Sequence, residues 1–220
     1  MKTAIILLIT LTLLLTSCTV DTTEDLCSDF EGAQKDDCYF EANQCSKVEN
    51  ELIRDSCVAN LAETKEDLAV CDLINDEKVK FSCMHKVAVV TNNQEICLDI
   101  QDDYWQDNCN FKLAVNNNEN EFCPYIIKAE KQLECRNEIA LATNDPLLCE
   151  YLGAVERERC IYQIAKASLN VETCDMLAQG INKDSCKLKI AKLTNNEELC
   201  EEISFDMIKE DCKQNFQTEI

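Results

Sequence analysis

Cysteine is the residue of this chain whose number and spacing could support chemistry. The 220-residue sequence contains seventeen cysteines, and sixteen of them follow one another at nearly regular steps from Cys27 to Cys212. Cysteines can bind a metal, exchange electrons, close structural disulfides or carry a lipid. The odd total indicates that one cysteine has a different role from the other sixteen.

The spacing argues against metal binding and against thiol-redox catalysis. Zinc sites use ligands two to four residues apart, whereas these cysteines are mostly 11 to 14 residues apart, and no C-x-x-C pair occurs. His85 is the single histidine, and it has no accompanying nucleophile or carboxylate motif. The acidic stretches lack a calcium-binding loop pattern and are interpreted as solvated surface. We therefore expect no catalytic residue, no metal and no cofactor, and we do not expect an enzyme.

Cys18 is the cysteine outside the regular series, and it directly follows an apolar segment. Lys2 precedes the apolar stretch from Ala4 to Leu15, which is shorter than the roughly 20 residues that a spanning helix needs. A basic start, a short apolar run and small residues before the break are typical of a secretory signal peptide.

The motif Leu15-Thr16-Ser17-Cys18 resembles the lipobox of bacterial-type lipoproteins. The resemblance implies that residues 1–17 are a signal peptide, that the Cys18 sulfur carries a diacylglyceryl group, and that its amine is acylated, for example with palmitate. A lipidated Cys18 cannot form a disulfide, which leaves sixteen cysteines to pair. Two or more acyl chains anchor a protein stably, so residues 18–25 are expected to be a short tether to the membrane.

This interpretation predicts a location outside the cytosol, on the cell surface or on the periplasmic face of the envelope. Disulfides persist in such compartments. Removal of residues 1–17, which include Lys2 but no acidic residue, takes the formal charge from −21 to −22. Phosphate contacts need clusters of Lys and Arg, so nucleic-acid binding is not expected. Attraction to anionic lipid headgroups is also excluded, and the membrane contact is assigned to the lipid anchor.

The sixteen other cysteines define an internal repeat over residues 26–220. From Cys45 onward the steps alternate between 12 and 14 residues, with a single step of 11, so the repeat is about 26 residues long and occurs eight times. Apolar residues keep the same register. Three residues after each first cysteine stand Phe30, Val48, Ile74, Ile100, Ile126, Leu152, Leu177 and Ile203. Four residues after the second stand Leu61, Val87, Leu113, Ile139, Ile164, Ile190 and Phe216, with alanine next at 62, 88, 114, 140, 165 and 191.

Steps of three and four residues place these side chains on one helical face with the cysteine, and strand alternation is not seen. Junctions such as "TNNQEIC" and "TNDPLLC" begin helices, because Asn and Asp are preferred N-caps. Their alternative interpretation is ligand-binding loops. Gly153 and Gly180 mark a second break between paired cysteines. The predicted fold is all-α, an α-solenoid-like array of eight disulfide-stapled helical hairpins.

Two regular disulfide schemes are compatible with this repeat, and local geometry alone does not choose between them. Pairing between repeats leaves Cys27 and Cys212 unpaired at opposite ends unless the array closes into a ring, and the step of 7 between Cys38 and Cys45 breaks its spacing. Pairing within repeats uses all sixteen cysteines and is the predicted scheme. It joins Cys27–Cys38, Cys45–Cys57, Cys71–Cys83, Cys97–Cys109, Cys123–Cys135, Cys149–Cys160, Cys174–Cys186 and Cys200–Cys212.

The function expected from these features is that of a membrane-anchored binding or scaffold module. Solenoids present extended surfaces to partners, and Trp and Tyr are enriched in interface hot spots. Tyr104 and Trp105 form the densest aromatic pair and are the candidate recognition residues, with core packing as the alternative. The acidic charge favours a basic or neutral protein or glycan as the partner. The alternative functions are a structural envelope component without a discrete ligand, and a thiol-redox protein or other enzyme.

Overall fold

The computed structural model describes residues 25–178 and 180–217. Within these residues the chain consists of helices, turns and connecting segments, and contains no strand. The all-α repeat array expected from the sequence is therefore confirmed. The predicted signal peptide, the lipobox and Cys18 lie outside the described residues.

Long and short helices alternate along the chain, with most of the short ones of 3-10 type. In order they are α1 (Ala33–Glu41), η1 (Cys45–Lys47), α2 (Glu51–Lys65), η2 (Leu68–Leu73), α3 (Glu77–Thr91), α4 (Gln94–Leu98), α5 (Asp103–Asn117), η3 (Asn120–Tyr125), α6 (Ala129–Thr143), η4 (Pro146–Tyr151), α7 (Ala154–Ser168), α8 (Val171–Cys174), α9 (Ile181–Thr194), η5 (Glu197–Glu202) and α10 (Asp206–Gln217).

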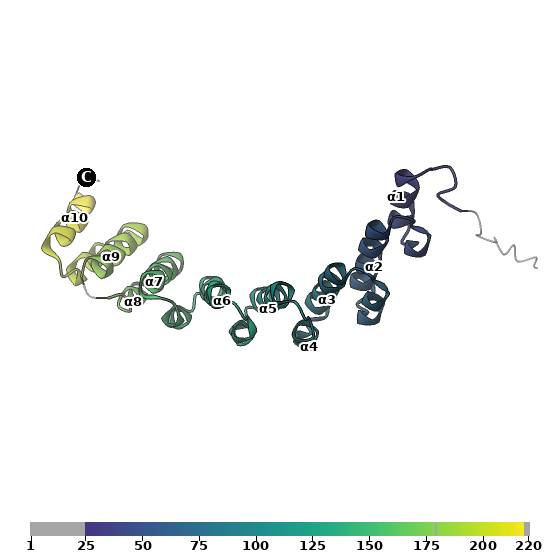
Figure 1. The fold of residues 1–220 in the computed structure, drawn as a ribbon. Coiled ribbons are helices and arrows are strands. Elements are labelled where there is room, and N and C mark those ends of the chain that lie inside the picture. Colours follow the sequence, from purple (N-terminus) through teal and green to yellow (C-terminus); the bar gives the residue numbers. More distant parts are fainter. Residues whose placement is uncertain (1–24, 179, 218–220) are drawn as a thin grey trace, which may run out of the picture.

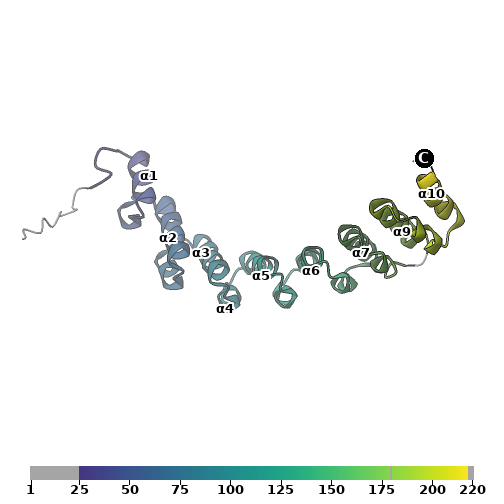
Figure 2. The same cartoon turned by 180° about the vertical axis from the view of Figure 1, so that it is seen from behind.

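The repeats are arranged in series along an open, curved array (Figure 1). The long helices α3, α5, α6 and α7 follow one another along the inner side of the arc, whereas the short helix α4 lies on its outer side. The view from behind shows the same order, with α1 and α10 at opposite ends (Figure 2). Each repeat therefore contacts mainly its neighbours, as expected for a solenoid.

Each repeat is closed by a disulfide between its short segment and its long helix. All eight bonds join the two cysteines of one repeat, with Cα–Cα distances of 5.5 to 5.9 Å. These distances are typical of disulfides. The pairing in the structure is that of the intra-repeat scheme. Fifteen of the sixteen cysteines are buried, so the disulfides lie in the core along the whole array.

The apolar residue three positions after each first cysteine is buried in a different way from the one expected. It does not lie on the helical face of the cysteine, because the short helix ends there and the backbone becomes extended, as at Ile74 with φ −85° and ψ 129°. Its N–H closes the short helix on the cysteine carbonyl, for example from Ile74 to Cys71 over 3.2 Å. The side chain enters the core at the hinge that leads into the long helix, where Ile74 is 5% exposed.

The asparagine-rich junctions between repeats end one helix as well as starting the next. Asn92 ends α3 in the left-handed conformation with φ 50°. The N–H of Asn93 donates to the Ala88 carbonyl over 2.9 Å, which is the bond of a Schellman motif. The Asn93 side chain then accepts from the Glu95 N–H over 3.0 Å and caps α4. The expected capping role is thus correct for the second asparagine, while the first asparagine is a C-cap.

The repeated alanine has a clear role in this junction. Ala62, Ala88, Ala114, Ala140, Ala165 and Ala191 are all fully buried, and each accepts the bond that closes its long helix. A residue with a larger side chain would have no room at these positions, because the next repeat packs against them.

The first repeat departs from the predicted hairpin. Residues 26–29 form turns in place of a short helix, and α1 is only nine residues long. Phe30, which was expected in the core, is 44% exposed, because none of the described residues forms a repeat before it.

Candidate functional site

The predicted recognition residues Tyr104 and Trp105 lie in the first turn of α5. Asp102 caps this helix by accepting the Trp105 N–H over 3.0 Å. Tyr104 is 59% exposed, whereas Trp105 is half-buried and packs against the core of the N-terminal repeats. The two rings meet edge to face with centroids 5.4 Å apart. The structure therefore assigns them different roles, with Trp105 as a partly buried support and Tyr104 as the accessible ring.

His85 on α3 extends this aromatic cluster across the boundary between two repeats. Its ring centroid lies 5.8 Å from that of Trp105. Burial lowers the pKa of His85, and the charges of Lys112 and Lys131 lower it further. A neutral imidazole is thus favoured at pH 7, which suits packing against an aromatic ring.

The surroundings of this cluster are locally basic, although the chain as a whole is acidic. Lys86 Nζ lies 3.2 Å from a carboxylate oxygen of Glu63 and 2.8 Å from the side-chain oxygen of Asn60 on α2. Lys131 Nζ on α6 lies 5.1 Å from the centre of the Phe111 ring on α5. It also donates to the side-chain oxygen of Asn108 on α5. These contacts link α2 to α3 and α5 to α6 through lysine side chains.

A set of carboxylates that was not identified from the sequence, most of them buried, ties five of the repeats to the repeat that follows. Asp107 on α5 is 1% exposed, and its two oxygens accept the N–H groups of Ile127 and Lys128 over 2.5 and 3.1 Å. These N–H groups belong to the hinge of the next repeat, just before α6. Asp107 therefore acts as a capping group supplied by the neighbouring repeat.

The same contact recurs at four other repeat boundaries. The carboxylates of Asp36, Asp55, Asp184 and Glu158 accept N–H groups from the hinge of the following repeat. All five acids stand two residues before the second cysteine of their repeat. The third and fifth repeats have Phe81 and Leu133 at this position and lack the contact. The recurring D-x-C pattern is the sequence signal that could have identified them.

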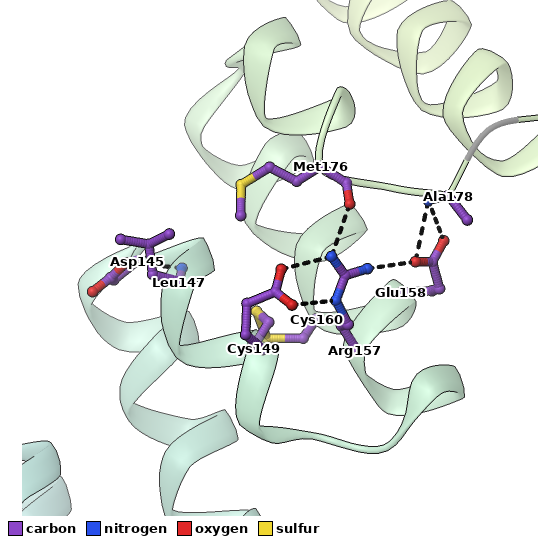
Figure 3. Close-up of polar contacts among 9 residues, drawn as sticks. Asp145, Leu147, Cys149, Arg157, Glu158, Cys160, Met176 and Ala178 are labelled. Carbon is purple, nitrogen blue, oxygen red and sulfur yellow. Dashed lines mark hydrogen bonds and ion pairs between the residues drawn. A yellow bond between two sulfur atoms is a disulfide. The ribbon is translucent and has the colours of Figure 1, made fainter.

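In the sixth repeat this contact is part of a larger ionic network (Figure 3). Arg157 forms a two-pronged ion pair with Glu150, with N–O distances of 2.6 and 2.8 Å, and also donates to the Met176 carbonyl over 3.1 Å. It contacts Glu158 over 2.8 Å, and Glu158 in turn accepts from the Ala178 N–H. The hydrogen bonds from Arg157 lower the pKa of Glu150. The network links η4 and α7 to the hinge that leads into α9.

A cavity lies next to this network, between α7 and α9. It has a volume of about 610 Å³ and is lined by Ala154, Val155, Glu158, Arg159, Tyr162, Leu177, Asn182 and Ser185. A second cavity of about 510 Å³ between α6 and α7 is lined by Glu130, Leu133, Glu134, Asn137, Leu141, Leu152, Glu156, Arg159 and Gln163. We call them the α7–α9 groove and the α6–α7 groove. Arg159 belongs to both.

The α7–α9 groove lies where the repeat changes locally. α9 begins five residues before Cys186, whereas α7 begins six residues before Cys160. The preceding residue, Gly180, has φ 114°, a backbone conformation that residues other than glycine rarely adopt. α9 therefore starts one residue later than α7 relative to its cysteine, and the small side chains of Ala154 and Ser185 line the space between the two helices.

Neither a metal-binding cluster nor a membrane-spanning helix is found among residues 25–178 and 180–217. There, no three His, Cys, Asp or Glu side chains converge as a metal site would require. Over the same residues, every helix is too short or too polar to span a membrane. Comparison with models of known protein families, with curated protein sequences and with solved structures found no match.

Proposed function

We propose that this protein is a lipid-anchored extracytoplasmic lipoprotein that binds a protein or glycan partner, as a binding or scaffold module without catalytic activity. The observation that supports this function best is a long surface of fixed shape that carries an exposed aromatic ring on a packed support. Tyr104 rests against Trp105 and His85, and the helices beneath them are held by one disulfide per repeat. An aromatic side chain already held in place loses little conformational entropy on binding.

The proposed location rests on two features. The sixteen paired cysteines favour an oxidising compartment, and the lipobox-like motif assigns Cys18 as the lipid attachment site. The formal charge of −21 makes attraction to anionic headgroups unfavourable, so a covalent anchor would hold the array at the membrane. A purely structural envelope role is the second candidate, favoured by the regularity of the eight disulfides.

One experiment in the native cells tests both parts of the proposal. Cells producing the wild-type protein, Cys18→Ser or Tyr104→Ala are labelled with a fatty-acid analogue and treated with a cross-linker. Cys18→Ser should lose the label and its retention in the membrane fraction. Tyr104→Ala should keep the label but recover at least fivefold less of the partner cross-linked to the wild-type protein, since truncation of a hot-spot aromatic costs more than 1 kcal/mol.

Tyr125→Ala is the matched control, because Tyr125 is another exposed tyrosine, at 49%, on the short helix η3. Trp105→Ala is less informative, because it removes core contacts as well as recognition surface. Unchanged labelling in Cys18→Ser would contradict the anchor. Equal cross-linking in Tyr104→Ala and Tyr125→Ala would contradict the recognition site. Substrate turnover that is lost on replacing His85 without unfolding would contradict a non-enzymatic function.

A further inference from the structure

The two grooves on either side of α7 form a surface that is separate from Tyr104 and Trp105. Several apolar side chains are exposed to solvent along it, among them Leu133 at 37% and Val155 at 65%. Both cavities are large enough for a bulky apolar side chain, and they fall within the range of natural ligand pockets. The exposed guanidinium of Arg159 lies between them and has no ion-pair partner within residues 25–178 and 180–217.

The charge beside the grooves indicates what kind of partner fits. Glu130, Glu134 and Glu138 follow one another at four-residue steps on α6, and Glu130 and Glu134 line the α6–α7 groove. Like charges at this spacing repel each other along a helix. None of the three forms an ion pair with another described residue, although acids elsewhere are paired, such as Glu201 with Lys209 and Lys213. A cationic partner would relieve this repulsion.

The spacing of the two grooves indicates the form of the partner. They lie on opposite sides of one helix, and neighbouring packed helices are about 8–10 Å apart. In an α-helix, residues i and i+7 lie on the same face about 10.5 Å apart along the axis. A helix lying across α7 could therefore place one apolar side chain in each groove, in the way that amphipathic helices occupy grooves of other proteins.

We propose that the α6–α7 and α7–α9 grooves together bind a basic amphipathic helix of a partner protein. Its apolar residues i and i+7 occupy the two grooves, an acidic residue at i+3 or i+4 faces Arg159, and Lys or Arg residues face the glutamates of α6. A second copy of this chain would not fit, because two molecules with a formal charge of −21 repel each other. This inference rests on the proposed binding function and names a class of partner for it.

Fluorescence anisotropy with synthetic helical peptides tests the proposal on the full, oxidised protein. The probe carries leucine at i and i+7, glutamate at i+4, and lysine at i−4 and i−3. The control peptide has the same composition with the second leucine moved to i+5. We expect the probe to bind at least tenfold more tightly than the control peptide, because only the probe can fill both grooves.

Three variants then place the binding on the protein. Val155→Asp should weaken probe binding at least tenfold, while Val90→Asp, at an exposed valine of α3 outside the grooves, should not. Arg159→Glu should shift the preference to a probe with lysine at i+4. Circular dichroism of each variant checks that the array remains folded.

Equal affinity for the two peptides, or equal loss in Val155→Asp and Val90→Asp, would show binding by net charge alone and would overturn the inference. Failure of every peptide to bind would also overturn it. If Tyr104-dependent cross-linking persists in that case, the proposed binding function stands without this partner class.

Discussion

Reduction of the eight disulfides is expected to remove most of the helical circular-dichroism signal of the array. The long helices contain only 9 to 15 residues, and isolated helices shorter than about 12–15 residues are marginal in water. The apolar core of each repeat is thin, and its centre is the disulfide itself. Each bond closes a loop of 11 or 12 residues, which contributes about 3 kcal/mol in the chain-entropy model.

The measurement is circular dichroism before and after treatment with a reductant, followed by alkylation to prevent reoxidation. Alkylation without reduction is the control. The double variant Cys97→Ser/Cys109→Ser removes one bond from the middle of the array and should lower the free energy of unfolding by about 3 kcal/mol. A reduced and alkylated protein that keeps its native spectrum would contradict this account, because packing alone would then hold the repeats.

Asp107→Ala is expected to produce the largest effect of any single substitution between repeats. The variant leaves the Ile127 and Lys128 N–H groups, which lead into α6, without their carboxylate acceptor. Loss of a helix-capping acceptor costs about 0.5–2 kcal/mol, so the free energy of unfolding should fall by about 2 kcal/mol. Because solenoid stability depends on contacts between neighbours, the two halves of the array should also unfold less cooperatively.

Denaturant unfolding of three variants separates this effect from a general one. Asp107→Asn keeps one carbonyl acceptor and should be destabilised less than Asp107→Ala. Asn116→Ala, at an exposed residue of the same helix, should change stability by less than about 0.5 kcal/mol. If Asp107→Ala is no less stable than Asn116→Ala, the carboxylate contacts do not couple the repeats.

The period of the cysteines and of the buried alanines was enough to predict the repeat and its two helices. A residue such as Ala88 recurs because the next repeat leaves no room for a larger side chain, and this constraint is visible as a period in the sequence. The sequence predicted a helical conformation for Ile74, but the backbone there is extended. A residue three positions after a cysteine can be buried either on the same helical face or just after the helix ends, and the sequence does not distinguish the two.

The candidate sites were less predictable because they depend on position in space. Asp107 is one of forty-two acidic residues, and only its register relative to the cysteine distinguishes it from a solvated carboxylate. The adjacent Tyr104 and Trp105 were identified together, but their different exposure depends on how α5 packs on α3. The α7–α9 groove lies where α9 starts one residue late after Gly180, a shift that leaves the cysteine period unchanged.

Each repeat is closed by its own disulfide, and, apart from the continuous backbone, neighbouring repeats are held together by non-covalent contacts. Peptide mapping of the oxidised mature protein without reduction tests this arrangement most directly. Cleavage at Lys112 and at acidic residues separates the cysteines of neighbouring repeats. The account predicts linked peptides containing Cys97 with Cys109 and Cys174 with Cys186, and no free thiol. A linked peptide joining Cys109 to Cys123 would contradict the intra-repeat pairing, because the disulfide bonds would then run between repeats.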